Sequence, residues 1–250
     1  MRAGQSGGKP SNGHADSAPS YGVLADLGPL DNEIEIRRSR FICRLQRVES
    51  EAEARAVISD RRAAHRLARH HCSAFVLGAG RAVQRSNDDG EPGGTAGTPM
   101  LEALVLHERE RGIPSSADLS DVVAVVTRYF GGVLLGAGGL VRAYSESVSA
   151  TLRLARLATR EARAVFGLEA PHATAGQWEN ELRARGTLVT GTDYAGATAM
   201  LSLAIPDSPG ARGLLAAEVA AVTAGRGALV PLGTEWVDLA AGRSGRSSPR

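Results

Sequence analysis

The segment at residues 121–130, DVVAVVTRYF, constrains the fold of this chain more than any other stretch. Valine and alanine fill residues 122–126 without a break, and the alternation of apolar and polar residues that marks a half-exposed strand is absent. Valine is also β-branched, which favours an extended backbone. The segment therefore predicts a central strand that is buried on both faces of a sheet.

The rest of the first half predicts strands and helices around that central strand. Ser50, followed three residues later by Glu53, is typical of a capping box at the start of a helix. Strands are predicted at 41–48, 72–78 and 82–86, and helices from the capping box to about residue 69, from Pro99 to about residue 111, and at about 140–157. This mixture predicts an α+β fold on a mostly antiparallel sheet.

The second half shows a regular succession of strand and helix patterns. Strands are predicted at 162–170, 187–196, 197–206 and 228–239, and helices at 173–186 and 208–227, each closed by glycine. The order β-α-β-β-α-β is typical of the ferredoxin-like arrangement. We therefore expect a first domain at residues 34–159 and a ferredoxin-like second domain at residues 160–240.

The two ends of the chain differ in composition from these domains. Residues 1–33 are rich in glycine, serine and proline without an apolar period, which predicts a disordered leader, and residues 241–250 predict a disordered basic tail. We expect no secretory signal, because the first residues lack an apolar stretch. No apolar run is long enough to span a bilayer, which excludes an integral membrane protein. Cys43 and Cys72 are the only cysteines, so we expect a reducing, cytoplasmic location.

The charge of the chain is nearly balanced. It has 29 basic and 27 acidic residues, for a net charge of +2 at pH 7, and Lys9 is its only lysine. The predicted first domain has the basic excess and the second domain an acidic one. A mild arginine excess permits a phosphate-rich partner such as RNA, but does not require one.

An acidic loop at residues 88–97, DDGEPGGTAG, is the first candidate for a functional role. Asp88, Asp89 and Glu91 place three carboxylates within four residues, and these repel one another unless a cation or an arginine compensates. They could hold Mg²⁺ through a phosphate, form a solvated turn, or pair with nearby arginines. Thr95 and the glycines around it indicate that the backbone comes close to a ligand or to another loop.

A glycine segment at residues 131–139 is the second candidate, because it leaves the central strand and enters a helix. Backbone N–H groups at a helix start bind anions, and glycines let a phosphate approach. The segment lacks the G-K-[ST] sequence of a Walker A loop, and tight packing of the loop over the sheet is the alternative interpretation. The predicted phosphate-binding residues are Arg128, Gly131, Gly132, Gly136, Gly138, Gly139 and Arg142.

The sequence predicts no catalytic residue, no metal ligand set and no cofactor. Ser145 and Ser147 have no evident base nearby. His71 precedes Cys72, but consecutive residues of a strand point to opposite faces, so this histidine is badly placed to activate the thiol.

Four motifs, considered together, are more specific than any one of them. They are SRF at 39–41, HHC at 70–72, DDGEPGGTAGTP at 88–99 and VVTRYFGGVLLGAGGLVRAY at 125–144. In this order they closely resemble the IMPACT/YigZ family over about residues 34–157. The resemblance implies a first domain like the second domain of ribosomal protein S5 and a second domain like a ferredoxin-like module of elongation factor G. It also implies a role linked to translation.

Our first hypothesis is a non-enzymatic protein that binds RNA, the ribosome or a translation factor. Arg128, Arg142 and the glycine segment would contact phosphate, while the acidic loop shapes the groove. The alternatives are a protein or enzyme that binds a phosphorylated small molecule or nucleotide with Mg²⁺ in the same cleft, and a protein-interaction adaptor that uses the second domain. The first two hypotheses require the acidic loop and the glycine segment to share one open pocket.

Overall fold

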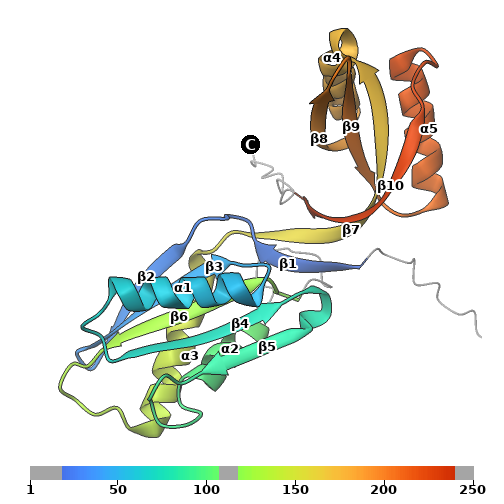
Figure 1. The fold of residues 1–250 in the computed structure, drawn as a ribbon. Coiled ribbons are helices and arrows are strands. Elements are labelled where there is room, and N and C mark those ends of the chain that lie inside the picture. The colour runs from blue at the N-terminus through green and yellow to red at the C-terminus, as the bar shows by residue number, and fades with distance from the viewer. Residues whose placement is uncertain (1–18, 107–117, 240–250) are drawn as a thin grey trace, which may run out of the picture.

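The computed structural model describes residues 19–106 and 118–239, which form two five-stranded antiparallel sheets with helices packed against them (Figure 1). This arrangement confirms the predicted α+β class. The first sheet has the order β2-β3-β6-β4-β5. Its strands are β2 (Leu30–Ile36), β3 (Ser39–Arg47), β4 (His70–Leu77), β5 (Val83–Asn87) and β6 (Val122–Tyr129).

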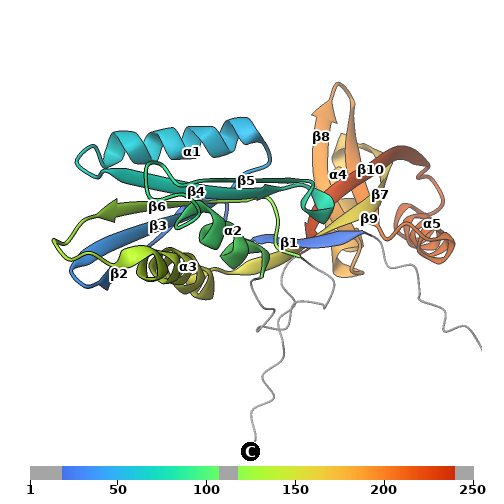
Figure 2. The same cartoon turned by 90° about the horizontal axis from the view of Figure 1, so that it is seen from below.

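Strand β6 is the buried central strand that the sequence predicted. Helix α1 (Glu51–Ala64) covers one face of the sheet, and α2 (Gly97–Val105) and α3 (Gly136–Leu154) cover the other (Figure 2). Val123 and Val125 pack on the side of α1, whereas Val126 joins the core formed with α2 and α3. Residues 122–126 therefore need apolar side chains on both faces of the sheet, which explains the continuous apolar run there.

Helix α1 begins at the predicted capping box, although only half of the box has the expected partner. Ser50 Oγ accepts a hydrogen bond from the Glu53 backbone N–H at 3.2 Å. The Glu53 carboxylate accepts from the N–H of Glu49, at 2.7 Å, rather than from that of Ser50.

Replacing Ser50 by alanine is expected to lower the free energy of unfolding by about 1 kcal/mol, because the Glu53 N–H loses its partner. Urea unfolding followed by circular dichroism measures this change. Ser50→Asp serves as the control, since aspartate also accepts from the first turn. Equal midpoints for the alanine variant and the unmodified protein would contradict a capping role for Ser50.

The second half has the predicted element order β-α-β-β-α-β. Strand β7 pairs with β9 on one side and β10 on the other, and β8 follows β9 at the edge. Leu168 and Leu201 of the sheet pack against Trp178 of α4 and Leu215 of α5, so the two helices cover the same face. The elements are β7 (Leu157–Pro171), α4 (His172–Ala184), β8 (Leu188–Ala195), β9 (Thr198–Ile205), α5 (Pro209–Thr223) and β10 (Leu229–Leu239).

The prediction of a disordered leader up to residue 33 is wrong for its second part. Strand β1 (Ser20–Leu24) pairs with β7, and β2 begins at Leu30. Tyr21 and Val23 are buried. The apolar stretch of β1 is too short to show a period, and the strand that pairs with it lies more than a hundred residues further along the chain. Residues 1–18 and the predicted tail lie outside the described residues.

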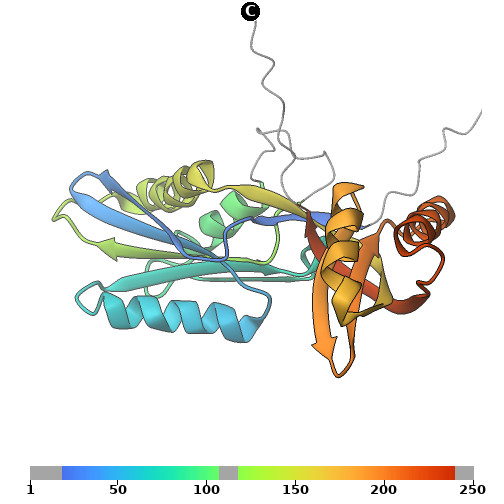
Figure 3. The same ribbon diagram turned by 90° about the horizontal axis from the view of Figure 1, so that it is seen from above.

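The predicted domain boundary between residues 159 and 160 lies inside strand β7. This strand continues from the end of α3 into the second sheet (yellow in Figure 3). Its first part pairs with β1 and its second part with β9, while β10 runs along most of its length. A shared strand, not a linker, therefore connects the two halves.

Helix bounds also differ from the predicted ones. Helix α3 begins at Gly136 rather than near Leu140, because Gly138 and Gly139 already belong to its first turn. Helix α1 ends at Ala64, before the predicted end near residue 69, and α2 ends at Val105. None of the helices in residues 19–106 and 118–239 is long and apolar enough to cross a bilayer.

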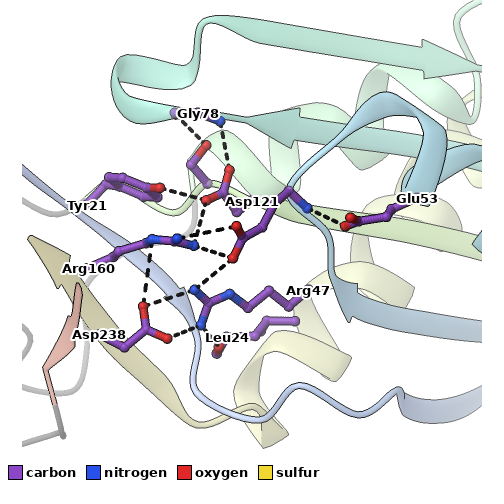
Figure 4. A network of polar contacts seen from close by, with 10 residues as sticks. Tyr21, Leu24, Arg47, Glu53, Gly78, Asp121, Arg160 and Asp238 are labelled. Carbon is purple, nitrogen blue, oxygen red and sulfur yellow. Dashed lines mark hydrogen bonds and ion pairs between the residues drawn. The ribbon is translucent and has the colours of Figure 1, made fainter. Parts of the chain in front are cut away.

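A network of charged side chains lies where the two halves meet (Figure 4). Arg160 of β7 bonds to Glu49 and lies 3.6 Å from Asp121. Arg47 of β3 donates to Asp238 of β10 at 2.5 and 2.9 Å. The hydrogen bond from Arg160 lowers the pKa of Glu49, so this carboxylate is charged at neutral pH.

Asp121 connects three segments of this network. Its carboxylate accepts from the Tyr21 hydroxyl at 2.6 Å and from the Gly78 backbone N–H at 2.8 Å. Burial, together with the neighbouring Asp121 carboxylate, raises the pKa of Tyr21. The network therefore fixes β1 and β7 against the start of β6.

Candidate functional site

Asp88 in the acidic loop binds backbone groups of its own loop. Its carboxylate accepts from the N–H groups of Gly94, Ala96 and Gly97 at 2.8–2.9 Å. Burial acts to raise the pKa of Asp88, but these three hydrogen bonds outweigh it and lower the pKa below its ordinary value. Asp88 therefore holds the start of α2 in place.

Asp89 attaches the loop to its neighbours on the other side. One carboxylate oxygen accepts from the His71 backbone N–H at 2.6 Å, and the other from Arg62 of α1 at 2.5 Å. The Asp89 carbonyl lies 2.9 Å from Nδ1 of His70. The Thr95 hydroxyl donates to the carbonyl of Pro92 at 2.6 Å, so it also takes part in the loop's own bonding.

Glu91 connects the acidic loop to the helix and strand that flank the glycine segment. Its side chain is only 4% exposed, and one oxygen accepts from Arg128 Nη1 at 2.6 Å and from the Tyr144 hydroxyl at 2.7 Å. Arg128 comes from β6 and Tyr144 from α3. The acidic loop therefore contacts residues on either side of the glycine segment, and these contacts are buried inside the protein.

These contacts decide among the alternatives for the acidic loop. Each of the three carboxylates has its own protein partners. Asp89 and Glu91 pair with arginines, as one of the alternatives predicted, whereas Asp88 binds backbone N–H groups. Across residues 19–106 and 118–239, no group of three or more histidine, cysteine, aspartate or glutamate side chains is placed to hold a metal ion. Burial raises the pKa of Cys72 to about 12, which keeps its thiol protonated and weakly nucleophilic.

Gly131 is the glycine for which the packing interpretation holds. Its N–H donates to Ser39 Oγ at 3.1 Å, and a Cβ atom at this position would lie 2.0 Å from the carbonyl carbon of Arg38. Gly132 and Gly136 have positive φ angles of 84° and 71° and open surroundings. Gly138 is also open, so the segment beyond Gly131 is accessible from solvent.

A groove of about 770 Å³ lies between the end of β2 and the first half of α3, and we call it the α3 groove. Of the residues predicted to bind phosphate, Gly139 and Arg142 line it, whereas Arg128 and the acidic loop do not. The prediction that the acidic loop shapes the groove is therefore not met. The lining residues are Ile36, Arg37, Leu135, Gly139, Val141, Arg142, Ala143, Ser145 and Glu146.

The arginines of this region are exposed and free. Arg37, Arg38 and Arg142 have no ion pair or hydrogen bond with any other described residue. Glu146, the one carboxylate among the lining residues, pairs with Arg153 at 2.6 Å. The groove therefore has an uncompensated positive charge.

Arg37 and Arg38 form the two-residue turn between β2 and β3. Their φ angles are 48° and 67°, so both have the left-handed backbone of a type I′ turn. Asparagine and glycine are favoured at these positions. A residue with a long side chain costs roughly 1–2 kcal/mol of folding free energy at each of them. Strain of this kind is characteristic of positions kept for a function.

Sequence reasoning missed Arg37 and Arg38 because it placed no strand at residues 30–36. The signal was present: LDNEIEI alternates apolar and polar residues, as does SRFICRLQR after the two arginines. Two alternating runs separated by two residues are typical of a hairpin. Glycine or asparagine is usual in such a turn, and its absence concealed the pattern.

Apolar side chains in the segment that precedes α3 are also exposed. Phe130 is 52% and Leu134 82% exposed. The guanidinium of Arg128 lies below Phe130, 5.6 Å from the centre of its ring. The surface therefore combines free arginines with apolar groups that could contact a ligand.

Known proteins resemble this chain over much of its length. The family model of the Impact N-terminal domain matches residues 37–152. The IMPACT family member YvyE of Bacillus subtilis is 44% identical over 176 residues, which cover 70% of this chain and 76% of that protein. YigZ of Escherichia coli is 42% identical and covers 52% of this chain and 60% of that protein.

A solved structure is also similar to this chain. The crystal structure of a hypothetical protein matches 85% of this chain and 97% of its own, with a TM-score of 0.54 and 32% identity. Its fold covers both sheets of the present structure. Together, the family model, the close relatives and the shared architecture establish that this chain belongs to the IMPACT family.

Proposed function

We propose that this chain is a non-enzymatic, translation-linked regulatory protein that binds ribosomal or other RNA through the α3 groove. Family membership supports a regulatory role in general. We further propose an S5-like first domain and a ferredoxin-like second domain. The sheet order β10-β7-β9-β8, with both helices on one face, supports the second of these assignments.

The arginine turn is the observation that carries this proposal. Arg37 and Arg38 occupy strained positions at which smaller residues are favoured, and neither forms a pair with the described protein. A guanidinium group pairs with a phosphate through two parallel hydrogen bonds. Arg142 supplies a third such group from α3, so the groove suits a polyanion.

Titration of a labelled RNA at 50 mM and 200 mM salt tests the proposal. If the three arginines each neutralise one phosphate of a single strand, the logarithm of the binding constant falls with the logarithm of the salt concentration with a slope of about −2. The affinity then falls roughly 20-fold between the two conditions. Absence of binding at 50 mM salt would remove RNA as the ligand.

We also propose that the protein acts in the reducing cytoplasm. The free thiols at Cys43 and Cys72 agree with this location.

A phosphorylated small molecule is a second candidate ligand for the same groove. The volume of about 770 Å³ lies in the range of roughly 300–1,000 Å³ that small-molecule sites occupy. A thermal-shift panel of nucleotides, with and without Mg²⁺, separates this candidate from RNA. Because the carboxylates of the acidic loop already have protein partners, a stabilising nucleotide should not depend on Mg²⁺.

A further inference from the structure

We infer that the α3 groove takes an unstacked nucleotide of single-stranded RNA and that duplex RNA binds it weakly. The inference rests on the proposed function and adds to it the strandedness of the RNA. It follows from the walls of the groove, its size and the position of its charges.

The walls of the groove are largely apolar. Ile36 of β2, Leu135 before α3 and Val141 of α3 contribute them. A site for phosphate alone needs only donors and charge, and an apolar wall adds nothing to it. The face of a nucleobase, in contrast, gains from burial against such a wall. Bases in an RNA duplex are stacked and paired, so only a single strand or a loop can offer one.

The volume of the groove agrees with a whole nucleotide. At about 770 Å³ it is far larger than a single phosphate group requires. On α3, Gly139, Arg142 and Glu146 are three and four residues apart, so they lie on one face of the helix. Gly139 allows Leu135 to pack closely at the start of this face, since a Cβ atom at residue 139 would lie 3.0 Å from the Cβ of Leu135.

The charges lie on both elements that form the groove. Arg37 comes from the turn after β2 and Arg142 from α3, so the phosphates on the two sides of one nucleotide could each meet a guanidinium. Ser145, which also lines the groove, has a hydroxyl without a hydrogen-bond partner among the described residues. It can donate to or accept from the edge of the base.

The first experiment compares one labelled 12-nucleotide strand, alone and annealed to its complement, at 50 mM salt. We expect the single strand to bind at least tenfold more tightly than the duplex. Equal affinities would overturn the inference while leaving the proposed RNA function in place. No binding of either RNA would remove both.

A second experiment separates the base from the phosphates. Val141→Ser changes a residue that is 37% exposed, so the fold should be retained. We expect this variant to bind the single strand about fivefold more weakly, with the salt dependence of binding unchanged. Arg142→Gln should instead reduce the slope by about 0.7. Leu214→Ser, which also replaces an exposed apolar residue of a helix by serine, and Arg226→Gln are the controls on and after α5, away from the groove, and should leave binding unchanged. Full binding by Val141→Ser would overturn the inference.

Discussion

Replacing Glu91 by glutamine is expected to lower the free energy of unfolding by about 3–5 kcal/mol. Glutamine has nearly the same shape, so the variant creates no cavity. It leaves the guanidinium of Arg128 buried without a countercharge, because the side chains of this pair are only 4% and 8% exposed. Tyr144 keeps an oxygen to donate to, which isolates the loss of charge as the cause. Urea unfolding measures the change through its midpoint and slope.

An exposed pair provides the matched control. Arg40 and Glu33 also approach to 2.6 Å, but both side chains are more than 40% exposed. Glu33→Gln should therefore have a much smaller effect, since solvent screens the pair. The double variant Glu91→Gln/Arg128→Met should be more stable than Glu91→Gln alone, because it removes the isolated charge. If it is not, the buried charge is not the cause of the loss.

Replacing Gly131 by alanine is expected to cost about 3 kcal/mol, the upper part of the range for overpacked sites. The added Cβ would lie 2.0 Å from the carbonyl carbon and 2.1 Å from the oxygen of Arg38, and 2.4 Å from the nitrogen of Ser39. All three are backbone atoms, so no rotamer change relieves the contact. The turn that carries Arg37 and Arg38 must move, and RNA binding should weaken with stability.

Gly138→Ala is the control within the same segment. No atom lies within 4 Å of the new Cβ, and the residue lies in the first turn of α3. Alanine is a better helix former than glycine, so the variant should gain about 0.5 kcal/mol. Thermal and urea unfolding of both variants then give shifts of opposite sign. Shifts of equal sign and size would show that the close approach to the Arg38 backbone is not the reason why alanine destabilises the protein at residue 131.

The central strand and the second half could be predicted because their patterns are local. A run buried on both faces identifies β6 without knowledge of its neighbours, and glycines mark the ends of the helices in the second half. Strand β1 could not be found in this way. Its apolar residues become meaningful only when β7 lies beside them, and pairing across such a separation leaves no local signal.

The contacts of the acidic loop could be predicted only in part. The sequence indicated that arginine could compensate the acidic loop, and Arg62 and Arg128 do so. It could not show that this compensation removes Arg128 from the surface. The burial of a charged side chain depends on partners from other elements, here Glu91 and Tyr144, and not on its own neighbours in the chain.

Strand β7 also limits how this protein can be divided. A fragment that stops after residue 159 would keep β1 but lose part of the strand that pairs with it, so Tyr21 would face water. A fragment that starts at residue 160 would separate Arg160 from Glu49 and Asp121. Neither fragment keeps all the pairing partners of β7, so the chain cannot be cut at this point without leaving unpaired strand edges on both products.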